Sequence, residues 1–335
     1  MTMSAERQIA ASEPLGRMPD FFIIGHAKCG TTALYEMLRR HPQVYMPDRK
    51  EPQYFSRENP QPQSTPERSV AFTGRRATSP EEYLALFSAA TPDQRLGEAS
   101  TSYIWSRSAA SRIADVRPDA RIIAILREPA SFLRSLHLQM LQNSVEVEKD
   151  FRKAVALEEA RRQGRQIPEN AYWPQALIYS DRVRYVEQLQ RFHAAFPPEQ
   201  VLVLIYDDFR RDNEATVRRV QRFLDIDDTA PLEVLGANPT IGVRSVGADR
   251  FVHRLRRGEG PLTGAVRASV KTLTPWKLRH HVLYPLRDRV IYGKPPPPDE
   301  RFASELRQRF RPEVVALSEY LDRDFLALWG YDRPG

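Results

Sequence analysis

The chain has 335 residues, of which 41% are hydrophobic and 28% charged, a composition typical of a soluble globular enzyme. Its net charge is +7, but the arginines are spread along the chain and no recognised nucleic-acid module stands out, so a basic basin for a small, multiply charged molecule is favoured over nucleic acid. The single cysteine excludes an internal disulfide framework and favours a reducing, cytoplasmic location, and no apolar run approaches the ~20 residues that span a bilayer.

Residues 1–18 lack the continuous apolar core of a secretory signal and are expected to form a flexible, polar lead-in. Residues 19–335 are expected to form a single domain. Apolar strands alternate with helical patterns along it, which predicts an α/β fold with a parallel sheet covered on both faces. The expected strands are residues 21–24, 95–99, 121–126 and 201–206, and the expected helices are residues 31–40, 80–87, 107–116, 130–141, 151–160, 175–196 and 213–224.

Two stretches interrupt this rhythm. Residues 56–79 are rich in proline, serine, arginine and glutamine and are expected to form a surface excursion. Residues 229–298 are less regular, contain many arginines and end in a proline run, so we expect an irregular cap of helices and loops over the site. Residues 300–329 return to an amphipathic helical pattern, which we expect to be interrupted near Pro312.

A glycine-bounded loop, residues 25–30, joins the first expected strand to the first expected helix. Backbone N–H groups of such a loop and the positive end of the helix dipole bind anions. The run GHAKCGTT nearly fits the nucleotide pattern G-x-x-x-x-G-K-[ST], but Thr31 occupies the lysine position and Lys28 lies inside the loop. Lys28 would supply a positive charge, Thr31 and Thr32 would donate hydrogen bonds, and Cys29 is expected to fill the tight loop. The alternative is a glycine-rich turn without a ligand.

The run ILREPASFLRS places Arg127 directly after an apolar strand and Ser135 about two turns into the following helix. An arginine fork together with a hydroxyl group suits a phosphate dianion. The alternative is a surface salt bridge for Arg127 and a plain helical serine, and this motif taken alone favours the alternative.

The run KEPQYFS brings a carboxylate, Glu51, next to the aromatic pair Tyr54 and Phe55. Glu51 would act as a general base if the fold held it beside an acceptor hydroxyl; the alternative is a solvated loop carboxylate. His137 is a rival base because histidine titrates near neutrality, although we expect it on a helix surface.

The run LGEASTSYIW ends an expected strand in small hydroxyl residues and aromatics, as at the rim of an active site. Glu98 either assists the reaction or anchors a loop. The aromatics of this region, including Tyr54 and Tyr103, predict a partly apolar pocket for a small-molecule, lipid or saccharide acceptor.

Together, and in this order, these segments resemble the sulfotransferases that use 3′-phosphoadenosine 5′-phosphosulfate (PAPS), in particular the heparan-sulfate-type branch and its bacterial relatives. GHAKCGTT resembles the 5′-phosphosulfate loop, and ILREPASFLRS resembles the 3′-phosphate motif. KEPQYFS is similar to the segment that holds the catalytic glutamate of that branch. The resemblance covers roughly residues 20–228 and implies a P-loop-like, three-layer fold with a central parallel sheet flanked by helices.

The resemblance also implies roles for single residues. The 5′-phosphosulfate would be cradled by Lys28, Cys29, Gly30, Thr31 and Thr32. Arg127 and Ser135 would hold the 3′-phosphate, and Glu51 would take the proton from an acceptor bound by Tyr54, Phe55 and Tyr103. A second basic loop is expected over the nucleotide, and Arg244 and Ser245 are the nearest candidates, although they do not match the lysine–glycine–arginine loop of the branch.

The predicted reaction is an in-line transfer of a sulfuryl group from PAPS to a hydroxyl or amine, with catalysis by positioning and charge stabilisation. No metal is expected, because lysine, arginine and the helix dipole supply the positive charge. The first alternative is a nucleoside-triphosphate kinase, for which Asp207 and Asp208 are the candidate metal ligands. The second is a non-catalytic nucleotide sensor. Either a monomer or a homo-oligomer is compatible with the sequence.

Overall fold

A five-stranded parallel sheet forms the centre of the molecule. The computed structural model describes residues 16–56, 77–169, 171, 173–233, 242–243, 292–293 and 295–332. The strand order is β2–β3–β1–β4–β5, and every neighbouring pair is parallel. The strands are β1 (Phe21–Ile23), β2 (Val44–Tyr45), β3 (Arg95–Ala99), β4 (Arg121–Leu126) and β5 (Val201–Ile205).

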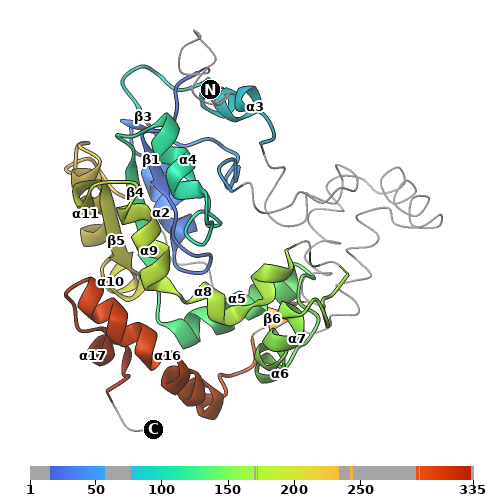
Figure 1. Cartoon of the computed structure of the whole chain (residues 1–335). Helices are drawn as coiled ribbons and strands as arrows, with labels where there is room; N and C mark the ends of the chain where they lie inside the picture. Colours follow the sequence, from blue (N-terminus) through green and yellow to red (C-terminus); the bar gives the residue numbers. More distant parts are fainter. Residues whose placement is uncertain are drawn as a thin grey trace, which may run out of the picture.

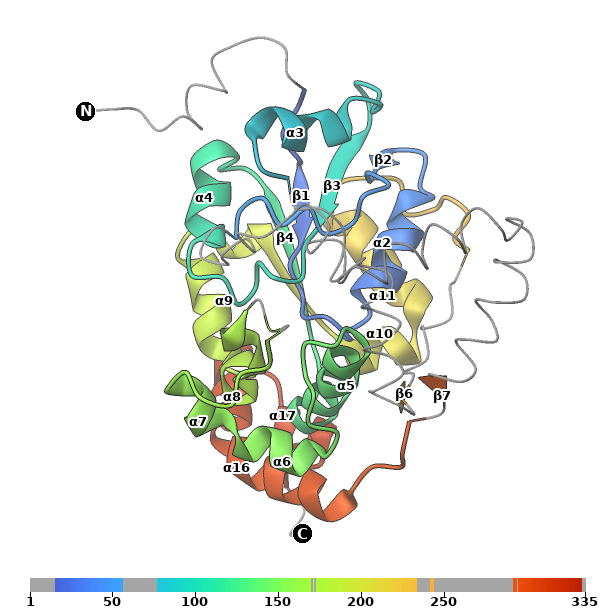
Figure 2. The same ribbon diagram turned by 90° about the vertical axis from the view of Figure 1, so that its right-hand side faces the viewer.

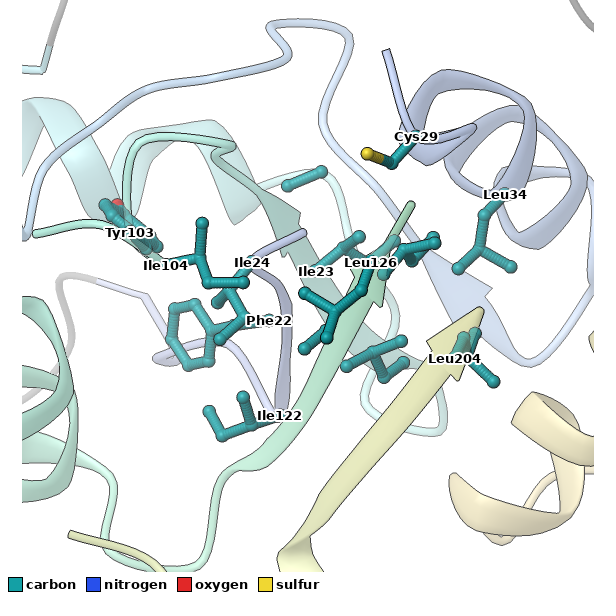
Figure 3. Close-up of a cluster of buried hydrophobic side chains, with 14 of the residues drawn as sticks. Phe22, Ile23, Ile24, Cys29, Leu34, Tyr103, Ile104, Ile122, Leu126 and Leu204 are labelled. Carbon is teal, nitrogen blue, oxygen red and sulfur yellow. The ribbon is translucent and has the colours of Figure 1, made fainter. Parts of the chain in front are cut away.

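Helices cover both faces of this sheet and give three layers. Helices α4 (Ala109–Val116) and α9 (Tyr185–His193) lie together on one face, and α2 (Thr31–Arg39) and α11 (Asn213–Phe223) lie on the other (Figures 1 and 2). The strands are accordingly apolar and buried on both sides, as parallel strands require. Figure 3 shows Leu34 of α2 pointing toward the strands that carry Leu126 and Leu204. The predicted fold class is confirmed.

The remaining elements lie around the two ends of the sheet (Figure 2). Helix α16 packs on α5, α9 and α17, and the short antiparallel pair β6–β7 lies beside α5 (Figure 2). These elements are α3 (Pro80–Leu84), η2 (Ala85–Phe87), α5 (Pro129–Gln142), α6 (Phe151–Ala156), α7 (Glu158–Arg162), η3 (Pro174–Leu177), α8 (Tyr179–Arg182), η4 (Pro198–Gln200), α10 (Tyr206–Arg211), β6 (Gly242–Val243), β7 (Tyr292–Gly293), α16 (Glu300–Tyr320) and α17 (Phe325–Trp329).

Three predictions about the helices are wrong. The expected helix 151–160 is divided at Leu157 into α6 and α7. The expected helix 175–196 is divided into η3, α8 and α9, and the expected break near Pro312 does not occur, because α16 runs through it. Buried side chains continue at helical spacing on both sides of this proline, so packing of the helix outweighs the loss of one backbone N–H group. The buried residues of α16 are Phe302, Leu306, Phe310, Val314 and Leu317.

Parts of the expected organisation fall beyond the structural description. Most of residues 56–79 and of the expected cap, 229–298, lie outside the described residues, and so do Arg244 and Ser245. Within the part of the chain that is described, no helix has both the length and the apolar character needed to cross a bilayer.

Candidate active site

The carboxyl edge of the sheet gathers polar side chains from all five strand ends. Lys28 follows β1, Glu51 follows β2, Thr101 follows β3, Arg127 follows β4, and Tyr206 follows β5. Parallel strands end at the same edge of a sheet, and ligands of such folds bind there. The order of the strands therefore brings together residues that are far apart in the sequence.

Four of these five residues line one cavity of about 250 Å³. Two lysines and an arginine face a single carboxylate there, so the cavity is electropositive. Its polar lining consists of Lys28, Thr31, Thr32, Lys50, Glu51, Arg127 and Gln139. A small, positively charged cavity with hydroxyl donors suits a phosphate or sulfate group.

The loop before α2 adopts a backbone that favours glycine. Gly30 has a φ of 89° and forms the N-cap of α2, and a Cβ atom there would lie 2.9 Å from a ring carbon of Phe209. Gly25 passes so close to β4 that a Cβ atom would lie 2.5 Å from the amide nitrogen of Ile125. No side chain caps the start of α2, which leaves the N–H groups of its first turn for an anion.

Arg127 joins the end of β4 to the loop. Its Nη1 donates a hydrogen bond to the carbonyl oxygen of Lys28 at 2.9 Å, and its guanidinium lies 4.7 Å from the ring centroid of Tyr206. Burial, and then repulsion by Arg127, lower the pKa of Lys28. The surface salt bridge considered for Arg127 is not found: no acidic partner pairs with it among the residues that the structure describes.

Glu51 is held inside the cavity rather than in solvent. It is 9% exposed, and its Oε2 accepts a hydrogen bond from the Thr101 hydroxyl at 3.0 Å. Lys50 Nζ lies 3.9 Å from the other carboxylate oxygen and donates to Thr32 Oγ1 at 2.8 Å. Burial lowers the pKa of Lys50, while the negative charge of Glu51 opposes that shift. Lys50 is a site residue that the sequence reasoning missed, although its place beside Glu51 could have indicated it.

Helix α5 contributes Gln139 to the cavity wall. The helix begins at Pro129 as predicted, and the Glu128 side chain caps it by accepting two backbone N–H groups. Ser135 lies one turn before Gln139 and is 3% exposed, but it is not part of the cavity lining. The Gln139 Oε1 atom is buried and has no hydrogen-bond partner within the described ranges. Nothing in the sequence motifs had marked this residue.

The three aromatic residues expected to contact the acceptor lie in the core. Tyr54, Phe55 and Tyr103 are at most 3% exposed, and none of them lines the cavity. Tyr54 stacks on Tyr83 with ring centroids 4.4 Å apart, and the Tyr103 hydroxyl donates to Glu98 Oε2 at 2.8 Å. We therefore assign them to the packing beneath the Glu51 segment. Glu98 has the anchoring role, because it also accepts the Tyr83 hydroxyl at 2.8 Å.

His137, the rival base, is buried, whereas the sequence had suggested a position on the surface of a helix. His137 is 2% exposed, its Nδ1 lies 2.9 Å from the Tyr179 hydroxyl, and its Nε2 lies 3.2 Å from the carbonyl oxygen of Lys149. Burial lowers its pKa. Both ring nitrogens of His137 are therefore engaged in contacts that support the fold.

Cys29 is fully buried within the loop, as expected of a small filling residue, and its side chain points into the core (Figure 3). Burial raises the pKa of its thiol to about 12, so the thiol stays protonated.

Asp207 and Asp208, the candidate metal ligands of the kinase alternative, are engaged in contacts within the fold. Asp207 accepts the Trp329 indole N–H at 3.0 Å, and Asp208 pairs with Arg323 at 3.0 Å.

Comparison with known proteins shows which family the chain belongs to. The model of the sulfotransferase family matches residues 19–230. Carbohydrate sulfotransferase 15 of Mus musculus is 27% identical over 265 residues, which cover 62% of this chain and 44% of that protein. Bifunctional heparan sulfate N-deacetylase/N-sulfotransferase 3 of Homo sapiens is 28% identical over 219 residues, which cover 63% of this chain and 22% of that protein. The chain thus spans less than half the length of these relatives.

A solved structure of similar extent supports the fold. A sulfotransferase from Alicyclobacillus acidocaldarius superimposes with a TM-score of 0.63 and 24% sequence identity, and the match covers 95% of this chain and 100% of that one.

Proposed function

The chain belongs to the sulfotransferase family, and from this we propose that it transfers a sulfuryl group from PAPS to a hydroxyl or amine of an acceptor. One observation carries the proposal. Lys28, Arg127 and Glu51 line the same cavity at the carboxyl edge of the sheet, and Arg127 is hydrogen-bonded to the Lys28 carbonyl. A nucleotide gripped at both phosphate-bearing ends needs cations from two separate segments that meet in this way.

The proposed chemistry follows from the position of each charge. The acceptor oxygen attacks the sulfur in line, an O–S bond forms, and the bond from sulfur to the bridging phosphate oxygen breaks. Glu51 takes the acceptor proton, and Thr101 and Lys50 hold its carboxylate in place for this role. Lys28 stabilises the negative charge that grows on the departing nucleotide.

Arg127 and the start of α2 have binding roles toward the nucleotide and take no part in the chemical step. The guanidinium of Arg127, which lies 4.7 Å from the ring centroid of Tyr206, would bind the 3′-phosphate through its planar N–H groups. Ser135 is proposed to assist on the same side. Thr31, Thr32 and the uncapped first turn of α2 would hold the 5′-phosphosulfate.

We propose a saccharide as the acceptor class. The support comes from the relatives, whose names include carbohydrate and heparan sulfate sulfotransferases. The three buried aromatics give no support to an apolar acceptor, because none of them lines the cavity.

The test of the donor is calorimetric titration with 3′-phosphoadenosine 5′-phosphate (PAP) and, separately, with ADP, both in excess chelator. Charge-assisted hydrogen bonds to the 3′-phosphate, at ~1.5–3 kcal/mol, predict a preference for PAP of roughly 10- to 100-fold. Equal affinities, or binding of ADP in a parallel titration with magnesium in place of chelator but not in chelator, would instead support the kinase alternative. Tight PAP binding without turnover on any saccharide would support the alternative of a non-catalytic nucleotide sensor.

The test of the base is a single-turnover assay of Glu51→Gln. The amide keeps the shape of the side chain and can still accept from Thr101, but it cannot take a proton. We expect a loss of ~10²–10⁴-fold, as for the removal of a general base. Full activity of this variant would remove Glu51 from the role.

A further inference from the structure

A second cavity lies beside the segment that carries His26 and Lys28. Its volume is about 390 Å³, and it is bounded by α8, α9 and the segment that follows β3. Four arginines contribute to its wall, and we call it the Arg182 pocket. The lining residues that matter here are Trp105, Arg107, Arg182, Arg184, Gln188 and Arg191.

A buried cation, Arg182, lines the pocket. Arg182 is 6% exposed, and its guanidinium lies 4.1 Å from the ring centroid of Trp105. Its Nε and Nη1 atoms are buried and meet no hydrogen-bond acceptor in the part of the chain that is described. Arginine is almost never fully buried unless it is paired, because an unpaired buried charge is costly. Burial lowers the pKa of Arg182 to about 9, which expresses the same cost.

The two acids in the pocket do not neutralise this cation. Asp181 forms hydrogen bonds with Arg162 at 2.8 and 3.1 Å, and Glu187 pairs with Arg191 at 2.9 Å. The attraction of Asp181 to Arg182 is a smaller effect on the pKa of Arg182 than burial. Among the described residues, neither acid of the pocket therefore forms an ion pair with Arg182.

Short connections tie the pocket to the proposed reaction centre. The Gln188 Oε1 atom in its wall lies 2.7 Å from Nε2 of His26, which stands two residues before Lys28 in the loop of residues 25–30. Trp105 stands four residues after Thr101, the hydrogen-bond donor to Glu51, and four residues span at most ~14 Å. The Arg182 pocket is thus in contact with the loop that carries Lys28, and it lies close along the chain to the residue that binds Glu51.

We propose that the Arg182 pocket is an anion-binding subsite for the acceptor, separate from the donor cavity. It takes a carboxylate or sulfate-ester group carried by the same molecule whose hydroxyl or amine reacts beside Glu51. This inference rests on the proposed function and names a feature of its substrate: the acceptor is an acidic saccharide, and its charge is bound by the planar donors of Arg182.

The experiment titrates the PAP-saturated protein with a tetrasaccharide of alternating glucuronic acid and N-acetylglucosamine, and with its carboxyl-reduced, neutral counterpart. The wild-type protein is expected to bind the acidic tetrasaccharide at least ~10-fold more tightly. Arg182→Met is expected to abolish that preference while PAP affinity stays unchanged. Arg311→Met removes the same charge from an exposed site on α16 and should keep the preference.

Stability separates a binding role from a structural one. Removal of an unpaired buried charge should leave the thermal midpoint of Arg182→Met unchanged or higher, whereas a structural arginine would lower it. Arg184→Gln, on the exposed rim of the pocket, should weaken binding of the acidic tetrasaccharide by ~2- to 5-fold, and this variant serves as the test if Arg182→Met does not fold.

Three results would overturn the inference: no preference in the wild type, a preference that survives in Arg182→Met, or, if that variant does not fold, no weakening in Arg184→Gln. If PAP itself fails to bind, the proposed function falls instead.

Discussion

The buried carboxyl group of Glu98 makes the free energy of unfolding depend on pH. Glu98 lies on β3 with no exposed surface, and the hydroxyls of Tyr83 and Tyr103 both donate to its Oε2 at 2.8 Å. Burial raises its pKa from 4.5 to about 7, although the hydrogen bonds oppose this shift; the negative charge of Glu51 adds to it. The folded protein therefore holds this proton over a range in which the unfolded chain has already released it.

The direction and the magnitude of this pH dependence follow from the linkage between proton binding and folding. Between pH 4.5 and about 7 the folded state binds more protons than the unfolded state, so the free energy of unfolding falls as the pH rises and then levels off. The difference is about 2.5 pH units. At ~1.4 kcal/mol per unit, Glu98 costs the folded protein ~3 kcal/mol at pH 8 relative to pH 4.

The measurement is urea unfolding of the wild type and of Glu98→Gln at pH values from 4.5 to 8. The glutamine oxygen can still accept both tyrosine hydroxyls, but the side chain does not titrate. The wild type should lose ~3 kcal/mol more than the variant across this range. His26, whose pKa burial lowers to about 3, contributes equally to both proteins. Glu199→Gln, at an exposed position, should follow the wild type. Parallel profiles for the wild type and Glu98→Gln would refute the reasoning.

Three further changes test the site and the fold. Lys28→Ala should lower the single-turnover rate with PAPS by ~10²–10³-fold, and near-normal turnover would contradict the assignment of the loop. Arg127→Lys keeps the charge but loses the planar fork, so calorimetry should show a loss of ~10-fold or more for PAP and a smaller loss for adenosine 5′-phosphate; equal losses would argue against a 3′-phosphate contact. Arg161→Met leaves Glu146 buried without the partner that binds it through two hydrogen bonds of 2.8 Å, and should lower the free energy of unfolding by ~3–5 kcal/mol; a loss below ~1 kcal/mol would show that the pair is not needed.

Strong local patterns made the sheet and the loop of residues 25–30 predictable. The continuous apolar run of β4 and the paired glycines around Lys28 each depend on neighbours within a few residues, and both appear where the sequence placed them. β2 has two residues, Val44 and Tyr45, which is too short for any periodicity to register. Its position is set by pairing with β3, a contact between segments about fifty residues apart.

The residues missed at the site have the same explanation. Gln139 and Tyr206 were marked by no sequence motif, and Lys50 belongs to the KEPQYFS run but was not assigned a role; each reaches the cavity from a different part of the fold. The predictions for the aromatic residues were wrong in the opposite sense, because these residues were expected at the site and lie in the core. Tyr54 and Tyr103 look like an active-site rim in sequence, but packing against Tyr83 and Glu98 draws them into the core.

The divided helix shows how a local error can hide a functional feature. Residues 175–196 have the amphipathic pattern of one helix, yet the chain leaves helical geometry between α8 and α9. The break is stabilised from a distance: Gln188 donates to the carbonyl oxygens of Asp181 and Arg182, and Glu313 of α16 accepts the Val186 N–H. In an unbroken helix those carbonyl groups would bond to backbone N–H groups four residues on. The break instead ends α8 at Arg182, whose side chain stacks on Trp105 from the segment after β3. The proposed subsite thus depends on the interruption that the sequence pattern concealed.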